Sequence, residues 1–456
     1  MSIHTRRLLQ GTSGSNSTST DTVYNATIYN GSGGTQTVDT GMNLTVSGGM
    51  ILIKSLFGTV SWGVFDTERG VGKLLQTNVN SQEENQTASL TAFTSNGFTL
   101  DSYGNFNDSA STFIAYTFRK AEKFFDIVTY TGNGSNRTIS HNLNCAVGMI
   151  WVKRRDSANN WCVYHRSSNQ GVANAGYYTL NLNNTLERIT DSGVWNNTEA
   201  TTTHFSVGTN DEVNANNSEY VAYLFAHDPS ATGKIKIDYW DSGHNGPPAN
   251  TLGTAFGWEA DFLMAKRLQG ADDRWFVWDY ERGWGLRDQK VLWLDQSTAS
   301  TTYDDTDLIF TPVDKGFYER GDRSVGRLLN SSNYASVKMM YMAIRKELDD
   351  VGDISGTLNA NDTGAKTVFY PSTGVSGTGP AYKNAELTRT PKVDMAWDIT
   401  NYTSSGTWAN YARPMGSGKL SGNNALSAAT DANHRFHIKK TQTDLGEGFG
   451  SGLSNQ

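Results

Sequence analysis

The chain has 456 residues, a formal net charge of −7 at pH 7 and only 18% charged residues. That length is more than one hydrophobic core usually serves, so several domains are expected. The negative charge argues against a general nucleic-acid binder, which needs a basic stripe. The combination of 46 glycines with 11% aromatic residues suits short strands joined by many turns and disfavours disorder.

Neither targeting nor membrane insertion is indicated. No run of 18 apolar residues occurs, so no transmembrane helix is predicted. The N-terminus has no apolar segment of signal-peptide length, and we expect the protein to be made in a cytoplasm. The two cysteines, Cys145 and Cys162, are predicted to be reduced thiols.

The first 21 residues are polar, basic and rich in Ser, Thr and Gly. We interpret residues 1–21 as an arm that becomes ordered against a partner, and the alternative is a disordered terminus. The candidate attachment residues of this arm are His4, Arg6, Arg7, Leu8 and Leu9.

A hairpin pattern then recurs four times, at residues 49–69, 148–166, 261–282 and 393–413. Each copy has an apolar strand, a polar turn, a tryptophan and an arginine, and such internal repetition has to be settled before the fold is assigned. The repeated structural anchors are Trp62, Arg69, Trp161, Arg166, Trp275, Arg282, Trp408 and Arg413.

The elements around each hairpin also repeat in order. An opening strand and a Gly-rich turn come before it, and a closing aromatic strand such as 113–120 ends the unit. The predicted fold class is all-β, a tandem array of about four β-sandwich (jelly-roll or lectin-like) units with little helix. The predicted boundaries are 22–120, 124–227 and 234–346 for units 1 to 3, 347–365 for a linker and 366–456 for unit 4.

Unit 4 lacks the closing strand of the other three units. A missing last strand would leave an unpaired sheet edge. Either a neighbouring chain completes the unit or the native chain continues past Gln456, and we favour the second.

Two interpretations of the repeated tryptophans are open. They could stack on a sugar beside the arginines, or they could be core anchors, and recurrence at one position in every unit favours the core. Asp66 with Arg69, and Asp279 with Arg282, could form ion pairs that steady a turn.

Catalytic and metal motifs are weak throughout the sequence. The run from Asp304 to Asp307 could hold Ca²⁺ but lacks the Gly and distal Glu of a dedicated loop, so a solvated turn is favoured. The eight histidines show no metal spacing, and no G-x-S-x-G, P-loop or H-E-x-x-H is present. We therefore predict no enzyme and no cofactor.

Several motifs together resemble a known family. They are YNGSGGTQTV, VTYTGNGSNRTISHNL, GMIWVKRR with NWCVYHR, FDTERG, TSNGFTL, YVAYLFAHD and YMAIRK. In this combination and order they resemble the tandem-repeat tail-fibre-like virion structural proteins of tailed bacteriophages, especially marine and cyanobacterial ones, from about residue 22 to 456. The resemblance implies a virion protein without assigned catalysis, and a polypeptide with further units.

The first hypothesis is a virion structural protein that forms a fibre or appendage of the tail or neck, is anchored by its N-terminal part and contributes to host attachment. Its partners would be other tail, neck or portal-adjacent proteins, further copies of itself in a trimer and a host-surface receptor, without nucleic acid or membrane insertion. The alternatives are a capsid or collar decoration protein, a glycan-binding adhesin and, least favoured, a depolymerase.

Overall fold

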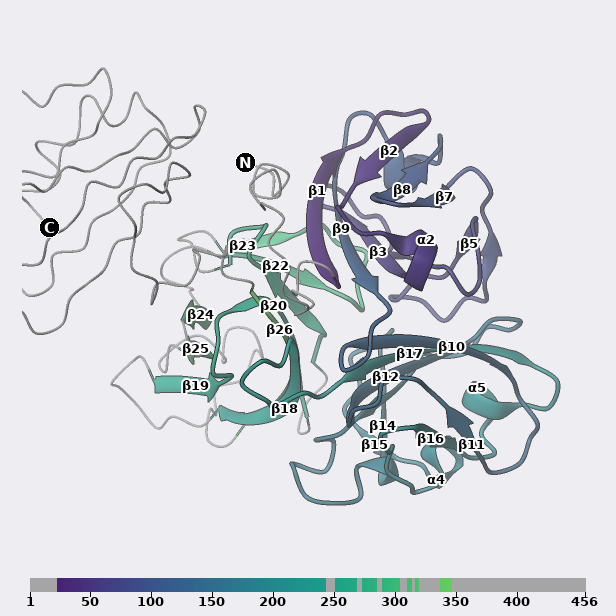
Figure 1. Cartoon of the computed structure of the whole chain (residues 1–456), viewed down its shortest axis with the longest axis vertical. Coiled ribbons are helices and arrows are strands. Elements are labelled where there is room, and N and C mark those ends of the chain that lie inside the picture. The colour runs from purple at the N-terminus through teal and green to yellow at the C-terminus, as the bar shows by residue number, and fades with distance from the viewer. Residues whose placement is uncertain are drawn as a thin grey trace, which may run out of the picture. The chain divides into compact units, whose positions relative to one another are not determined.

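The computed structural model describes residues 23–242, 251–268, 273–284, 289–303, 310–313, 316–319 and 337–346. These residues form mainly strands in antiparallel sheets, which confirms the all-β prediction (Figure 1). The predicted linker, unit 4 and N-terminal arm up to residue 21 lie outside the described residues. In the part that is described, no helix is long and apolar enough to cross a membrane.

Repeat 1 is the name used here for residues 23–120. Its main sheet has the order β1-β9-β3-β4, and a second sheet has the order β2-β8-β7. The main-sheet strands are β1 (Tyr24–Asn30), β9 (Thr112–Arg119), β3 (Gly49–Ser55) and β4 (Gly63–Asp66). The other elements are β2 (Gln36–Asp39), α2 (Leu44–Ser47), β5 (Lys73–Leu74), β6 (Glu84–Asn85), β7 (Leu90–Thr94), β8 (Gly97–Leu100) and α3 (Gly104–Asn107).

Repeat 2, residues 124–227, has a main sheet of order β10-β17-β12-β13-β14-β15 and a small sheet of β11 and β16. The main-sheet strands are β10 (Phe125–Thr131), β17 (Glu219–Ala226), β12 (Val147–Arg154), β13 (Cys162–His165), β14 (Tyr178–Asn181) and β15 (Ile189–Thr190). The other elements are β11 (Arg137–Ser140), η2 (Ala175–Tyr177), α4 (Ser192–Trp195), β16 (His204–Val207) and α5 (Asp211–Asn214).

Repeat 3, within residues 234–346, has a main sheet of order β18-β26-β20-β21-β22-β23 and a second sheet of order β19-β25-β24. The main-sheet strands are β18 (Ile235–Ser242), β26 (Val337–Arg345), β20 (Ala260–Arg267), β21 (Phe276–Asp279), β22 (Gln289–Trp293) and β23 (Thr301–Tyr303). The second sheet holds β19 (Thr251–Ala255), β24 (Phe310–Val313) and β25 (Gly316–Glu319).

The first four strands of the three main sheets correspond residue by residue. In the hairpins the paired residues are Met50 with Asp66, Met149 with His165 and Phe262 with Asp279. Between the hairpin and the closing strand they are Leu52 with Tyr116, Trp151 with Tyr223 and Met264 with Met342. Asp66, His165 and Asp279 therefore occupy one position of the repeat, and Tyr116, Tyr223 and Met342 another.

Both faces of each main sheet are buried, which explains the apolar runs in the sequence. Along β3, Ile51 and Ile53 face the core within repeat 1, whereas Met50 and Leu52 face a core shared by all three repeats. Since successive side chains of a strand point to opposite faces, a single strand serves both cores. The shared core makes the three repeats one packed body.

Gly148 of β12 lies at a close approach of repeats 2 and 3. A Cβ at this position would lie 2.7 Å from Cβ of Ile237 in β18. We expect Gly148→Ala to lower the free energy of unfolding by about 1–3 kcal/mol, because the packed core resists overfilling. Urea titration of the full chain measures this.

Gly34→Ala is the matched control. A Cβ on Gly34 would have nothing within 4 Å, so its cost should stay within about 0.5 kcal/mol. Equal stabilities of the two variants would contradict the close approach.

Candidate functional site

Three equivalent tryptophans connect the repeats. Trp62, Trp161 and Trp275 are 0%, 0% and 1% exposed. Each indole Nε1 donates to a backbone carbonyl of another repeat: Trp62 to Trp293 (2.8 Å), Trp161 to Gln76 (2.9 Å) and Trp275 to Asn181 (2.8 Å). Repeat 1 thus donates to repeat 3, repeat 2 to repeat 1 and repeat 3 to repeat 2, so these bonds form a closed cycle.

Three buried lysines follow the same cycle. Each lies at the end of the first hairpin strand, and its Nζ donates to a carbonyl of its own hairpin turn. Each Nζ also donates to another repeat: Lys54 to Ser297 (3.0 Å), Lys153 to Asn80 (3.2 Å) and Lys266 to Thr185 (3.1 Å). Burial lowers the pKa of Lys54 and of Lys153 to about 8. These ammonium groups therefore depend on the carbonyls that replace water.

The contact regions are named here by the repeats they join. Joint 1–2 includes the bonds of Trp161 and Lys153, joint 2–3 those of Trp275 and Lys266, and joint 3–1 those of Trp62 and Lys54. Since repeats 1 and 2, and repeats 2 and 3, follow each other in the chain, joint 3–1 closes the cycle without a covalent connection.

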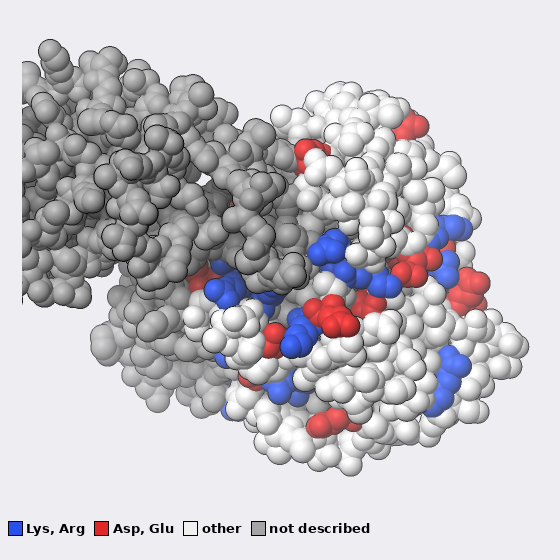
Figure 2. Space-filling view, in the orientation of Figure 1, with Lys and Arg blue, Asp and Glu red and all other residues white. Residues whose placement is uncertain are grey.

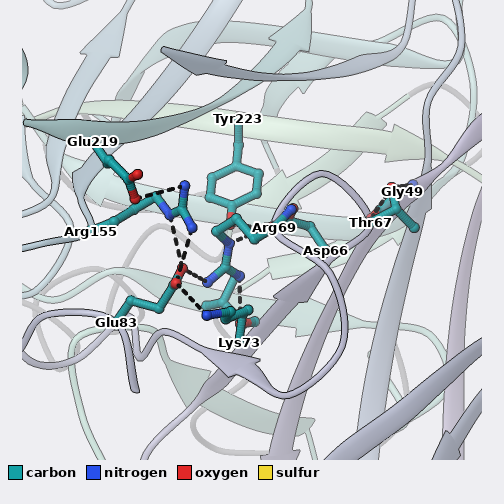
Figure 3. A network of polar contacts seen from close by, with 10 residues as sticks. Gly49, Asp66, Thr67, Arg69, Lys73, Glu83, Arg155, Glu219 and Tyr223 are labelled. Carbon is teal, nitrogen blue, oxygen red and sulfur yellow. Dashed lines mark hydrogen bonds and ion pairs between the residues drawn. The ribbon is translucent and has the colours of Figure 1, made fainter. Parts of the chain in front are cut away.

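A buried ion pair lies at the centre of joint 1–2 (Figure 3). The Nε of Arg69 donates to Oδ2 of Asp66, and both side chains are 0% exposed. The hydroxyl of Tyr223, from repeat 2, donates to the same Oδ2 at 2.6 Å, while Nη2 of Arg69 donates to the Val64 carbonyl at 2.9 Å. Burial raises the pKa of Tyr223 well above its ordinary value, so the phenol stays protonated and can donate.

The ion pair extends towards the rim of joint 1–2 through Glu83 (Figure 3). The Glu83 carboxylate accepts from Nη1 of Arg69 at 3.1 Å and from Nε and Nη2 of Arg155, in repeat 2, at 3.0 and 3.1 Å. Burial alone would raise the pKa of Glu83, but the hydrogen bonds and charges of Arg155 and Arg69 hold it below its ordinary value. A carboxylate of repeat 1 is thus shared by arginines of both repeats.

Joint 3–1 repeats this centre. Arg282 Nε donates to Asp279 Oδ2 at 2.5 Å, and both side chains are 0% exposed. The hydroxyl of Tyr116, from repeat 1, donates to the same oxygen at 2.6 Å. Arg282 Nη2 also donates to the Val277 carbonyl at 2.9 Å. The tyrosine–aspartate–arginine arrangement therefore occurs twice in equivalent places.

Joint 2–3 has a different centre. His165 takes the place of the aspartate, Met342 that of the tyrosine and Ser168 that of the arginine. Nε2 of His165 lies 3.3 Å from the Tyr341 carbonyl oxygen, and Nδ1 accepts the Ser167 N–H at 3.1 Å. Burial lowers the pKa of His165 to about 3. A neutral imidazole replaces the ion pair.

Of the eight predicted anchors, Trp62, Trp161, Trp275, Arg69 and Arg282 lie buried at the joints. The structure corrects the assignment of Arg166. It follows His165 as Thr67 follows Asp66, so its equivalent in repeat 1 is Thr67, and Ser168 takes the place of Arg69. The Arg166 side chain is 35% exposed, and Nη1 lies 3.5 Å from Oδ2 of Asp238.

The other candidate residues lie outside the described residues: Trp408, Arg413, His4, Arg6, Arg7, Leu8, Leu9 and the run from Asp304 to Asp307. Within the described ranges, no group of three or more His, Cys, Asp and Glu residues could hold a metal ion. Cys145 and Cys162 are free thiols.

The buried tryptophans have no ring face left for a sugar, which supports their interpretation as core anchors. Sequence reasoning missed the three lysines and the tyrosine–aspartate bonds. A signal for the lysines was present, because each ends an apolar strand eight or nine residues before its tryptophan. The buried side chains of the site form hydrogen bonds that cross from one repeat to another. The role that these contacts support is to hold the repeats together.

The tyrosine–aspartate bond can be tested by removing one oxygen. Tyr223→Phe should lower the free energy of unfolding by about 1.5–3 kcal/mol, because the hydrogen bond it removes ends on a charged carboxylate. Tyr116→Phe, the same change in joint 3–1, should cost a similar amount. Thermal and urea unfolding of the full chain give both values.

Tyr130→Phe is the control, since its hydroxyl donates to the neutral Val213 carbonyl within repeat 2 at 2.7 Å. We expect it to cost about 0.5–1.5 kcal/mol. If Tyr223→Phe costs no more than this control, the carboxylate bond does not hold joint 1–2.

Comparison with curated proteins finds no match to the chain. A family model described as "Domain of unknown function (DUF7483)" matches residues 19–291, more than half of the chain and a range that includes repeats 1 and 2 with their tryptophans and buried ion pair. The chain therefore belongs to the DUF7483 family.

Proposed function

We propose that the chain is a structural protein of a bacteriophage particle, a rigid building block in a fibre or appendage of the tail or neck. The observation that carries this proposal is the cycle of contacts between repeats. The recurring buried side chains are tryptophans, lysines, aspartates and arginines, and their contacts hold the repeats together. Such contacts are expected of a building block.

The joints support rigidity in particular. In joints 1–2 and 3–1, an indole, an ammonium group and a tyrosine–aspartate–arginine centre all cross between the same two repeats. Hydrogen bonds in a low-dielectric interior are strong, and each one left unmade is costly. Movement of one repeat against another would have to break several of them at once, so the three repeats transmit force as one body.

The charge distribution on the surface favours a role in assembly over the binding of a strongly charged polymer. On the part of the described surface that Figure 2 shows, most atoms belong to uncharged residues, and many of the Lys, Arg, Asp and Glu side chains lie in a band with both signs interspersed. A groove of one sign, which steers charged ligands, does not stand out on this face.

The choice of a phage particle rests on the motif resemblance described above. In that setting the basic N-terminal arm contacts another virion protein of the tail, the neck or the region near the portal. Further copies of the chain and a host-surface receptor complete the proposed set of partners.

A cryo-EM map of particles that contain the chain tests this proposal. We expect the three repeats to project from the tail or neck, with residues 1–21 against a neighbouring protein. If the repeats instead lie flat on the capsid lattice, the protein is a decoration protein and not part of a fibre. Specific binding of isolated host glycans by the chain would favour an adhesin.

Deletion of residues 1–21 separates attachment from folding. We expect the shortened chain to be lost from particles while its unfolding midpoint stays unchanged, because the joint contacts that the structure describes are all made by residues from Val23 onward. Mass spectrometry of purified particles measures incorporation. A second variant replaces only Arg6 and Arg7 by Ser in the full chain. Normal incorporation of the chain that lacks residues 1–21 would show that the arm is not the attachment point.

A further inference from the structure

Joint 2–3 contains two histidines at places where the other repeats have charged side chains. His165 stands where Asp66 and Asp279 stand. His227 follows β17 as Lys120 follows β9. His165 is 0% and His227 6% exposed, so both imidazoles are part of the packed joint.

Backbone N–H groups hold both imidazoles in the neutral form. Nδ1 of His165 accepts the Ser167 N–H at 3.1 Å, and Nε2 donates to the Tyr341 carbonyl at 3.3 Å. Nδ1 of His227 accepts the Ile237 N–H at 3.3 Å. A proton added to either Nδ1 would point at an N–H donor, and the hydrogen bond would be replaced by repulsion.

The charges around the two rings also bear on protonation. Nη1 of Arg166 lies 3.5 Å from Nδ1 of His227, and Lys236 of β18 adds to the positive charge near that ring. Asp238 of β18 is the carboxylate that faces both histidines. Its Oδ1 already accepts from the Ser167 hydroxyl at 2.9 Å and its Oδ2 lies 3.5 Å from Arg166, so it is shared among several groups.

We propose that joint 2–3 is an acid-sensitive joint, which loosens before joints 1–2 and 3–1 when the pH falls below the range in which exposed histidine is neutral. The other two joints have a tyrosine–aspartate–arginine centre in place of the neutral imidazole. Protonation of the histidines at low pH therefore weakens joint 2–3, while the other two joints lack these histidines. This inference rests on the contacts of the joint and is independent of the proposed virion role.

The direction of the effect follows from proton linkage. Burial lowers the pKa of His165 to about 3 and that of His227 to about 4, whereas an exposed histidine has a pKa of about 6.5. The open joint binds protons that the closed joint excludes, so the closed joint is favoured above about pH 6.5 and loses stability as the pH falls from there towards about 3, the lower of the two pKa values.

Hydrogen exchange of the full chain at pH 7 and pH 5, corrected for the intrinsic effect of pH on exchange, tests the proposal. Peptides covering β13 and β18 report on joint 2–3, and peptides covering β4 and β21 report on the other joints. With the pKa difference of His165 alone, opening of joint 2–3 should increase roughly 20-fold between pH 7 and pH 5. Opening of the other joints should change less.

His165→Gln removes the titrating group while leaving an amide that can donate to the Tyr341 carbonyl. We expect it to reduce the acid response of β13 and β18 by roughly 20-fold, which leaves the response that His227 contributes. If this variant does not fold, His165→Asn, whose oxygen can accept the Ser167 N–H, takes its place. An unchanged acid response in the folded variant would falsify the proposal, as would equal loosening of all three joints in the unmodified chain.

His141→Gln is the matched control within repeat 2. Nδ1 of His141 accepts the Leu143 N–H at 3.3 Å, and burial lowers the pKa of His141 too, but its partners all belong to repeat 2. We expect His141→Gln to leave the acid response of β18 in place. If it removes that response as fully as His165→Gln does, the response belongs to repeat 2 and not to the joint.

Discussion

The structure depends on charged groups that are buried between repeats and satisfied across the boundary. Asp66 and Asp279 each lie in a protein interior, beside an arginine of their own repeat and under a tyrosine of another. Removing one partner of a buried pair typically costs about 3–5 kcal/mol, because the other charge stays buried. The repeats are therefore interdependent, and repeat 1 or repeat 3 in isolation would expose an aspartate–arginine pair without its capping tyrosine.

The same constraint explains why both faces of the main sheets are apolar. One face packs on the second sheet of its own repeat, and the other packs into the shared core. A lysine at the end of this second face places an ammonium group where backbone carbonyls of a neighbouring repeat can replace its water. Tight packing and a few costly polar groups together select a single arrangement of the repeats.

The sequence predicted the all-β fold class and showed the recurrence of the tryptophans, because these depend on local patterns. It did not reveal the partners, since Tyr223 and Asp66 are far apart in the chain and only the packing of repeats brings them together. The error at Arg166 has a specific cause. Spacing alone matched the nearest arginine, whereas the strand register shows that repeat 2 has a serine, Ser168, at the relevant place.

Joint 2–3 shows what a cycle built from one polypeptide allows. In an assembly of three identical chains, a substitution changes every interface at once, so an exchange of aspartate and tyrosine for histidine and methionine would have to be tolerated three times. Here each interface is encoded separately. His165 and Met342 occupy a single joint, while the other two joints contain Asp66 with Tyr223 and Asp279 with Tyr116. Because separate segments of one chain encode the three interfaces, a substitution at one boundary leaves the residues of the other two unchanged.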